Sequence, residues 1–477
     1  MSLFAKDQRS LTIAMMAAVA AAAYNNLSVS AALPAIGDDL AKLDLLPWVV
    51  TTELVTSAIA VLAIGPVIDS IGTKAVFRTS IVAFAVSSAA CAFAPSIEFL
   101  IAARGIQGLT TGAIIANVMA AIGLGVPHAL RARAYATNST VWGIMGVGGP
   151  TLAAALLSVA SWQAIFLVNL PVAMLAGLIG WRAFPGVGEE PGEARADRIG
   201  LALVVCFTIF GLGAVSTLQW WTPIAVAGAA LCVWLYVRHE RSARAPVLRV
   251  RHLTDRSLRL LHGIGFLTIS SGICANTFLP VFIKGVRGTS TAQAAFAVVF
   301  LTVGWTSGAF ISSRISERRN GEFAIICAVS MLTFAATATA LSVATASPLA
   351  AVFAGYFGYG LAMGGASSAG VAVLQAKALP EEMGRVSSAH QFIRTLGFAY
   401  GAALSGALIF VTVARELGNA DIVRGLLRND VSAVPDGAVD ALERGFTLSA
   451  VVAAGLSYLA LALASRLRVG QVGSTNE

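Results

Sequence analysis

The composition of the 477-residue chain places it in a lipid environment. Hydrophobic residues occupy 57% of the positions and charged residues only 12%, whereas soluble domains carry about 25% charged residues. A mean hydropathy of +0.80 excludes a single soluble globule, because a globule of this size must present a polar surface to water. The net charge of +8 does not indicate a nucleic-acid partner, because the basic residues lie in short segments between apolar runs.

The apolar runs predict an all-α integral membrane protein. A spanning helix needs about 20 predominantly apolar residues, and helices satisfy their own backbone hydrogen bonds in lipid. In chain order we expect fourteen spans, at 11–34, 46–68, 75–94, 98–123, 134–158, 163–184, 199–216, 220–238, 259–282, 293–313, 323–342, 348–374, 384–412 and 447–466. Lys6 and Arg9 precede the first span as in a signal peptide, but the many later spans favour an uncleaved first span.

The positions of Lys and Arg predict how these spans are oriented. If the N-terminus is cytoplasmic, the inner segments hold 23 of the 32 basic residues and the outer segments hold seven. Cytoplasmic loops carry an excess of Lys and Arg, so we expect a multi-pass protein of the cell (cytoplasmic) membrane with both termini inside. The seven arginines between 238 and 259 either set this orientation or bind anionic lipid headgroups. The long outer loop at 413–446 is either a cap over the outer mouth or a solvated linker.

Enzymatic and nucleotide-driven functions find no support in the sequence. The chain has no Walker, HExxH or GxSxG motif and no His/Cys cluster with metal-ligand spacing. The cysteines all lie in apolar runs without a CxxC pair, which favours packing roles; they are Cys91, Cys206, Cys232, Cys274 and Cys327. We therefore expect no cofactor, no metal and no enzymatic activity.

Three short patterns stand out in the first six spans. Between spans 2 and 3 the chain has Gly65 and Asp69, followed by Gly72 and Lys74. Glycine permits a tight turn there, and Asp69 can cap the next helix or pair with a base on a neighbouring loop. Span 4 contains Arg104-x-x-Gln107-Gly108. Span 5 contains Gly143-Ile-Met-Gly146-Val-Gly-Gly149-Pro150 and is followed by Trp162-Gln-Ala-Ile-Phe166-Leu-Val-Asn169-Leu-Pro171.

In combination these patterns resemble the major facilitator superfamily, and specifically its fourteen-span drug:proton antiporter branch. The first resembles the GxxxDxxGxK signature, the second the RxxQG signature, and the third the antiporter signature, usually read as marking exporters. The stretch from Gly384 to Gly397 also resembles the penultimate helix of that branch. The resemblance implies a six-helix bundle in 1–185, two inserted helices with cytoplasmic linkers in 186–258, and a second six-helix bundle in 259–477. It also implies a central cavity with alternating access.

The chain departs from the family pattern at three places. Ser70 and Thr73 replace basic residues of the first signature, which predicts a weaker charge network in that loop. Ala153 and Ala154 replace a glycine pair in span 5 but remain small, so close helix packing should survive. Asn25 stands where the branch usually has a span-1 carboxylate. Since Asn cannot carry a proton by ionisation, the family's usual proton site is in question here.

Glu53 and Arg104 are the candidates for proton coupling. An ionisable side chain inside a span is costly, which makes it a functional hypothesis by default. Of the 24 acidic residues, only Glu53 lies well inside a predicted span. Both Glu53 and Arg104 lie roughly 10 Å from the outer ends of their spans at 1.5 Å per residue, so we expect them to pair. Movement of the arginine would then switch the proton affinity of Glu53. A static pair and exposure at the cavity rim are the alternatives.

Further polar residues are candidates for the cavity. Gln107 and Thr111 share a helix face with Arg104, and either line the cavity or bond to a neighbouring helix. His390 and Arg394, spaced i, i+4 in span 13, either serve transport or contact the cytoplasmic ends of the other bundle. The uncharged candidates are more often interhelical hydrogen-bonding residues than substrate contacts; they are Asn25, Asn117 and Asn276.

Three functions remain open on this sequence. The first is export of drug-like or lipid-like amphipathic compounds by proton antiport, with protons, a small-molecule substrate and membrane lipids as partners and a monomer as the working form. The second is an uncoupled or substrate-specific facilitator of a metabolite or lipid, which Asn25 favours. The third is a non-transporting membrane receptor or scaffold.

Overall fold

The computed structural model describes residues 3–40, 45–186, 197–217, 221–243, 246–279, 282–287, 291–345, 347–379, 382–417 and 437–467. Within these ranges the regular structure is entirely helical. The helices of the first half are α1 (Lys6–Leu40), α2 (Leu46–Ala92), α3 (Ile97–Gly125), α4 (His128–Val159), α5 (Gln163–Leu167), α6 (Asn169–Gly180), α7 (Arg198–Thr217) and α8 (Thr222–Glu240). Those of the second half are α9 (Val250–Thr254), α10 (Arg256–Asn276), η2 (Phe282–Val286), α12 (Thr291–Arg318), α13 (Gly321–Ala344), α14 (Leu349–Ala376), α15 (Met383–Leu417) and α17 (Ala438–Ala464).

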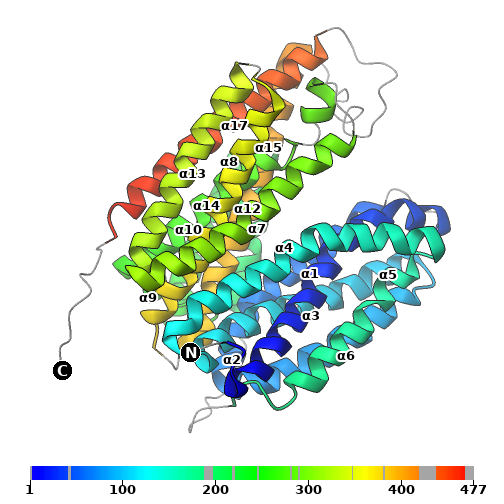
Figure 1. Cartoon of the computed structure of the whole chain (residues 1–477), viewed down its shortest axis with the longest axis vertical. Helices are drawn as coiled ribbons and strands as arrows, with labels where there is room; N and C mark the ends of the chain where they lie inside the picture. The colour runs from blue at the N-terminus through cyan, green and yellow to red at the C-terminus, as the bar shows by residue number, and fades with distance from the viewer. Residues whose placement is uncertain are drawn as a thin grey trace. The chain divides into compact units, whose positions relative to one another are not determined.

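The chain divides into two compact units (Figure 1). Unit 1 comprises 1–201, 242–252 and 371–392, and unit 2 comprises 202–241, 253–370 and 393–477. Unit 1 therefore contains the first six predicted spans together with the end of α14 and the start of α15. Most of the outer loop expected at 413–446 lies outside the described residues, as does much of the linker between α6 and α7.

Unit 1 is built around α3. Buried residues make up 78% of the most apolar stretch of this helix, and it packs along α2 over most of its length. Helix α1 packs against α4 and α6. A stacked pair of rings, Phe77 and Phe184, with centroids 4.0 Å apart, joins α2 to the segment after α6. The result is a closed apolar bundle in which the polar face of α3 points inward.

Twelve helices within the described residues are long and apolar enough to cross a membrane. Helix α2 is one of the twelve, yet its 47 residues would extend about 70 Å, roughly twice the hydrocarbon thickness of a bilayer. Two predicted spans, 46–68 and 75–94, lie within it. The span expected at 293–313 coincides with α12, which is not among the twelve. The count of fourteen spans remains a prediction.

The connection expected between the second and third spans contains a sharp break in the backbone. Helix α2 consists of two helices that meet at Gly72, where the backbone is non-helical (φ 80°, ψ 159°). This positive φ strains residues with a Cβ but not glycine. Gly72 of the signature thus makes the turn between the two halves of α2.

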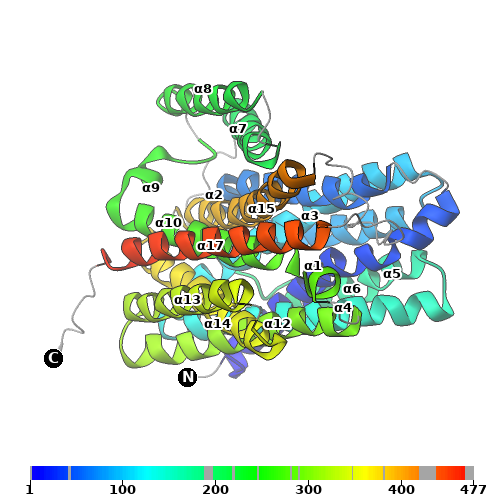
Figure 2. The same cartoon turned by 90° about the horizontal axis from the view of Figure 1, so that it is seen from above.

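Unit 2 contains α10, α13 and α17 packed together and α12 packed along α14. Helices α7 and α8 lie at the edge of this unit (Figure 2). Only 17% of the most apolar stretch of each is buried, and their outward side chains include Ile209, Ile224 and Trp234. Tyr400 of α15 fills the space beside Gly211 of α7. Such apolar outward faces suit contact with lipid.

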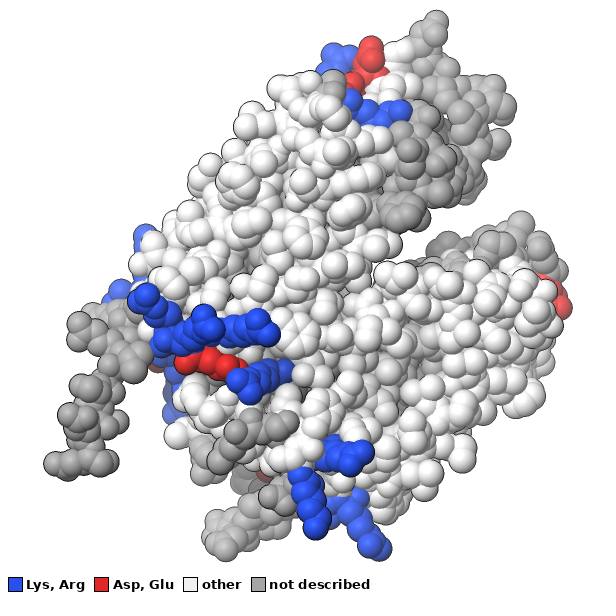
Figure 3. Space-filling model, in the orientation of Figure 1, with Lys and Arg blue, Asp and Glu red and all other residues white. Residues whose placement is uncertain are grey.

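Exposed charged side chains occupy limited parts of the surface. On the face drawn in Figure 3 they gather near the ends of the helices, and the surface between them is uncharged. Charged groups near the bilayer centre are costly, so this distribution is the one a membrane-spanning protein requires.

Helices α12 and α14 approach closely enough that only glycine fits between them. A Cβ on Gly364 would lie 1.9 Å from the Trp305 carbonyl oxygen, and one on Gly360 would lie 2.1 Å from the Leu301 carbonyl oxygen. A Cβ on Gly370, one and a half turns further along α14, would meet nothing within 4 Å.

We predict that Gly364→Ala lowers the thermal stability of the purified protein in detergent, because overpacking costs about 1–3 kcal/mol. Gly370→Ala is the matched control in the same helix and should leave the melting temperature unchanged or raise it. Equal melting temperatures for the two variants would contradict the close approach of α12 and α14.

Candidate functional site

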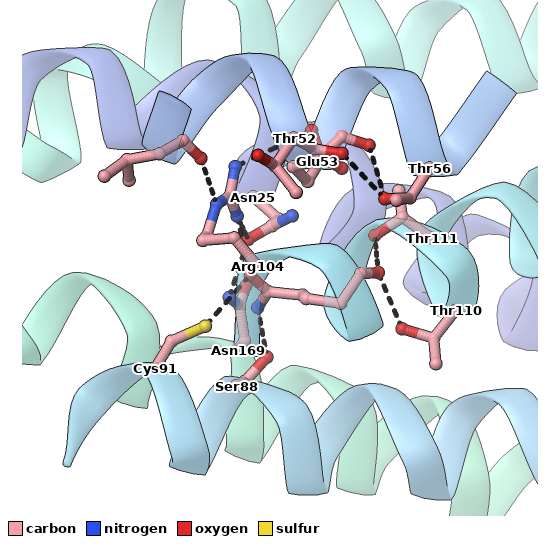
Figure 4. A network of polar contacts seen from close by, with 12 residues as sticks. Asn25, Thr52, Glu53, Thr56, Ser88, Cys91, Arg104, Thr110, Thr111 and Asn169 are labelled. Atoms are coloured by element: carbon pink, nitrogen blue, oxygen red, sulfur yellow. Dashed lines mark hydrogen bonds and ion pairs between the residues drawn. The ribbon is translucent and has the colours of Figure 1, made fainter. Parts of the chain in front are cut away.

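A network of polar side chains lies inside unit 1, where α1, α2 and α3 meet (Figure 4). Its centre is Arg104 of α3, which is only 1% exposed. The guanidinium donates from Nε to the Val49 carbonyl (3.0 Å). Its NH1 donates to Asn25 Oδ1 (3.0 Å) and to Gln107 Oε1 (2.6 Å). Arginine is charged at all physiological pH values and offers five N–H donors, so acceptors from three helices converge on it.

Glu53 of α2 supplies the counter-charge. Its Oε2 lies 3.6 Å from Arg104 NH2, and both side chains are 1% exposed. Thr111, two turns further along α3, lies beside Glu53, and its hydroxyl donates to the Gln107 carbonyl at 2.9 Å. The Asn26 amide is satisfied when its nitrogen faces Glu53, where it donates to Oε1 at 2.7 Å and to Oε2 at 2.9 Å. The carboxylate is thus held from α1 and α3 while its backbone belongs to α2.

The network extends from Arg104 through Gln107. The Gln107 amide nitrogen donates to Ser88 Oγ (2.7 Å), and the Cys91 thiol lies 3.6 Å from Gln107 Oε1. On the other side, Asn169 Nδ2 donates to Asn25 Oδ1 at 3.5 Å. The Phe166 ring lies 5.9 Å from the guanidinium carbon of Arg104, at the outer limit for cation–π attraction. Polar groups from both halves of α2 and from α6 therefore enclose the ion pair.

Two glycines of α3 bring the ion pair together. A Cβ on Gly108 would lie 2.3 Å from the Glu53 carbonyl oxygen, and one on Gly112 would lie 2.2 Å from the Ser57 carbonyl oxygen. Small residues at such positions let two helix backbones approach closely. Gly108 belongs to the RxxQG pattern. The same short pattern therefore supplies both the arginine and the glycine that lets α2 approach α3 closely.

The energetics of the site follow from burial. A charged pair removed from water is stable only when its remaining hydrogen-bonding positions are filled. Among the described residues Arg104 has four partners and Glu53 has two, and their formal charges cancel. A carboxyl in such a place can bind or release a proton, and the change alters the charge balance of the whole network.

A second cluster in unit 1 surrounds Asp69. Its Oδ1 accepts from the Gly384 backbone N–H (2.6 Å) and its Oδ2 from the Arg385 N–H (3.1 Å). The Arg385 guanidinium lies 3.4 Å from Oδ2. A Cβ on Gly384 would lie 2.4 Å from Asp69 Oδ1, and one on Gly65 would lie 3.0 Å from Ser388 Cβ. Asp69 thus caps the N-terminus of α15, a helix far along the chain, instead of the helix that follows it.

The inserted segment also reaches this cluster. Glu382, at the start of α15, pairs with Arg249 and with Arg251, the latter at 2.8 Å. The linker backbone is held in turn, since the Val247 N–H donates to Asp197 Oδ2 at 3.3 Å. Two of the seven arginines between 238 and 259 therefore have protein partners.

Residues of the same signature stabilise the break at Gly72 through hydrogen bonds. Thr73 Oγ1 donates to the Pro185 carbonyl (2.8 Å), and the Lys74 N–H donates to the same oxygen (3.0 Å). The Asn117 amide of α3 donates to the Thr73 carbonyl at 3.0 Å. Thr73, which departs from the family pattern, thus bonds to the end of the segment after α6 where a basic residue was expected.

The remaining sequence candidates lie apart from the ion pair. His390 is buried in the unit 1 part of α15. Arg394 belongs to unit 2, where its NH2 donates to Ser367 Oγ at 3.1 Å. Asn276 lies at the end of α10, with its Oδ1 buried and without a hydrogen-bond partner among the described residues.

The glycines of the antiporter pattern lie in α4. Gly149 faces Leu27 and Tyr24 of α1, with the nearest atom 3.6 Å from an added Cβ. Gly143 and Gly146 are half-buried in the same helix. The side chain of Pro150 is outside the described residues. No group of three or more His, Cys, Asp or Glu that would suit a metal ion occurs in the described part of the chain.

Comparison with known proteins decides the family. Residues 13–402 match the Major Facilitator Superfamily. The chain belongs to this superfamily. It is accordingly a multi-pass secondary transporter of small molecules and not an enzyme.

The relatives that follow are distant from this transporter in sequence. It is 26% identical over 415 residues to the multidrug transporter protein MdtP of Bacillus subtilis (strain 168), covering 85% of this chain and 76% of that one. It is 24% identical over 404 residues to the multidrug efflux pump SdrM of Staphylococcus aureus (strain N315), covering 83% and 88%. It is 26% identical over 436 residues to the uncharacterized MFS-type transporter Rv1877 of Mycobacterium tuberculosis (strain ATCC 25618 / H37Rv). The match covers 89% of this chain and 62% of that one.

Solved structures show the same fold. The human organic anion transporter MFSD10 (TETRAN) superposes with a TM-score of 0.67 at 15% identity, covering 96% of this chain and 99% of that one. A bacterial homologue of the iron transporter ferroportin, in an outward-facing state, gives a TM-score of 0.65 at 12% identity over 97% and 99% of the two chains. At these identities the likeness concerns the fold alone.

Sequence reasoning missed several members of the network. Asn26, Ser88 and Cys91 contact the ion pair or Gln107, yet none belongs to a recognised pattern. Asn169 belongs to the stretch after span 5 that was noted only as a family feature. The one available signal was Asn26 itself, a second amide beside Asn25 within an apolar span.

We predict that removing one member of the ion pair destabilises this transporter more than removing both. Arg104→Gln leaves Glu53 buried without its counter-charge, which should cost about 3–5 kcal/mol. The double variant Glu53→Gln with Arg104→Gln removes both charges and should recover part of that loss. The measurement is thermal unfolding of the purified proteins in detergent.

The exposed carboxylate of Glu98 lies on the same helix as Arg104, so Glu98→Gln is the matched control and should unfold like the wild type. A double variant no more stable than Arg104→Gln would argue that the pair does not interact.

Proposed function

We propose that the transporter exports small amphipathic compounds by proton antiport and that Glu53 carries the proton. The observation behind this proposal is the buried pair of Glu53 and Arg104, with 3.6 Å between Oε2 and NH2. In the described spans of unit 1 this carboxyl is the acid that lies in direct contact with a buried arginine. Protonation of Glu53 would release Arg104 to its other acceptors, Asn25 and Gln107.

Antiport requires that the proton site and the rest of the protein respond to each other. Neutral Glu53 would leave a net positive charge on the network, which is unfavourable in a low-dielectric interior. Opening of the bundle or entry of a substrate changes how that charge is compensated. The proton and substrate would thereby compete through the charge of Arg104, as exchange in opposite directions demands.

The direction and the class of substrate rest on sequence patterns and relatives. MdtP and SdrM are named as a multidrug transporter and a multidrug efflux pump, and the glycines of α4 follow the pattern usually associated with exporters. We extend that activity to this chain as drug-like or lipid-like export across the cytoplasmic membrane. Fourteen spans, cytoplasmic termini and a monomeric working form are parts of the same proposal.

The alternative is an uncoupled or substrate-specific facilitator for a metabolite or lipid. Asn25 favours it, because the usual span-1 carboxylate is replaced by an amide that cannot ionise. The two functions differ in one respect that can be measured, namely whether a pH gradient drives movement of the substrate through the wild-type protein.

We predict that Glu53→Gln abolishes export that depends on the proton gradient. Cells that produce the wild type should accumulate less ethidium than cells without it, and a compound that collapses the proton gradient should remove the difference. Cells with Glu53→Gln should accumulate as much dye as cells without the protein, because Gln retains the shape of Glu but cannot carry the proton.

Glu98→Gln serves as the control for loss of a carboxylate and should export like the wild type. An anionic dye tested in parallel extends the assay to the other charge class. Undiminished, gradient-dependent export by Glu53→Gln would rule out Glu53 as the proton carrier, whereas wild-type export that ignores the gradient would favour the uncoupled facilitator.

A further inference from the structure

Asn26 lies against the proposed proton carrier in a position that suits the ionised form of its carboxyl. Its amide nitrogen lies 2.7 Å from Glu53 Oε1 and 2.9 Å from Oε2, and the amide oxygen faces donors on its other side. The opposite orientation would place the oxygen against the carboxylate and the N–H₂ group against those donors. The amide therefore fits its surroundings only as a donor to Glu53.

From this geometry we infer that Asn26 is a positioning residue that favours the ionised form of Glu53. This inference rests on the function proposed above and adds a residue to it. The ionised Glu53 accepts two hydrogen bonds from Asn26 Nδ2. When a proton binds a carboxylate oxygen, that oxygen becomes a donor that faces another donor, so the contact with Asn26 is weakened.

The position of Asn26 in the chain gives this contact a consequence. Its neighbour Asn25 accepts from Arg104 NH1, so consecutive residues of α1 contact the two members of the ion pair. The charged or titratable groups that face Glu53 in the described residues are Arg104 of α3 and Cys91 of α2. Asn25 of α1, Thr111 of α3 and Asn169 of α6 complete the surroundings as uncharged groups. Asn26 is thus the residue of α1 whose hydrogen bonds change directly when Glu53 binds a proton.

The experiment measures the proton on Glu53 directly and needs no transported substrate. Infrared difference spectra of purified protein in lipid nanodiscs are recorded across a pH series, and the protonated carboxyl C=O band that is missing in Glu53→Gln is assigned to Glu53. Asn26→Leu keeps the size of the side chain but removes its donors. Its band should persist to higher pH, with the midpoint raised by about one pH unit, since a tenfold change in proton affinity is one unit.

Two further variants separate this role from simple packing. Asn26→Asp keeps an acceptor, loses the donors and adds a like charge, so its midpoint should also rise. Asn117→Leu removes a buried amide of the same kind that bonds to the Thr73 carbonyl instead, and it should leave the Glu53 midpoint unchanged. In protein labelled with ¹⁵N at asparagine, the side-chain N–H₂ signal lost in Asn26→Leu should titrate together with the Glu53 band.

The outcomes distinguish this inference from the proposed function. An unchanged midpoint in Asn26→Leu, or an equal rise in Asn117→Leu, would overturn the role of Asn26 even if transport proves to be proton-driven. A raised midpoint in Asn26→Leu alone would support that role even if export ignores the pH gradient, in which case the coupling proposal fails by itself.

Discussion

The burial of one guanidinium inside the helices of unit 1 constrains much of what surrounds it. Arg104 cannot lose its charge, and a bare charge in this environment costs more free energy than a folded membrane protein can absorb. Its acceptors come from α1, α2 and α3, namely Asn25, Val49 and Glu53, with Gln107 from its own helix. These contacts fix the depth, rotation and spacing of α1, α2 and α3. Gly108 is needed because α2 and α3 must approach closely for Glu53 to contact Arg104.

Helix α2 connects this requirement to the cluster around Asp69. Glu53 and Asp69 lie on the same helix, sixteen residues or about 24 Å apart along its axis, and both precede the break at Gly72. Asp69 holds the N-terminus of α15 through two backbone N–H groups and Arg385. Any movement of α2 that follows a change of charge at Glu53 would therefore act on the contacts of Asp69. The two clusters are satisfied separately, but one rigid element carries both carboxylates.

The sequence was sufficient for those features that depend on local pattern. Apolar runs predicted most helices within a few residues, and equal depth from the outer end predicted the proximity of Glu53 and Arg104. It was not sufficient where a partner lies far along the chain. Nothing local indicates that Asp69 caps α15, because the same carboxylate could cap the next helix. The glycine-rich signature did predict the turn between the second and third spans, which the structure places at Gly72 with its positive φ. Asn26 was missed because one amide in an apolar run carries no signal of what it faces.

The replacement of the usual span-1 carboxylate by Asn25 is better understood from the guanidinium than from the sequence position. Arg104 presents two terminal nitrogens, of which NH1 contacts Asn25 on α1 and NH2 contacts Glu53 on α2. A carboxylate on either helix would neutralise the same charge, so the electrostatic requirement does not specify which helix supplies it. An Asn on α1 then remains useful as an acceptor for NH1, and the acid on α2 retains the ability to ionise. The site keeps one acid and one base in contact, and what differs from the family pattern is the helix on which a proton would be carried.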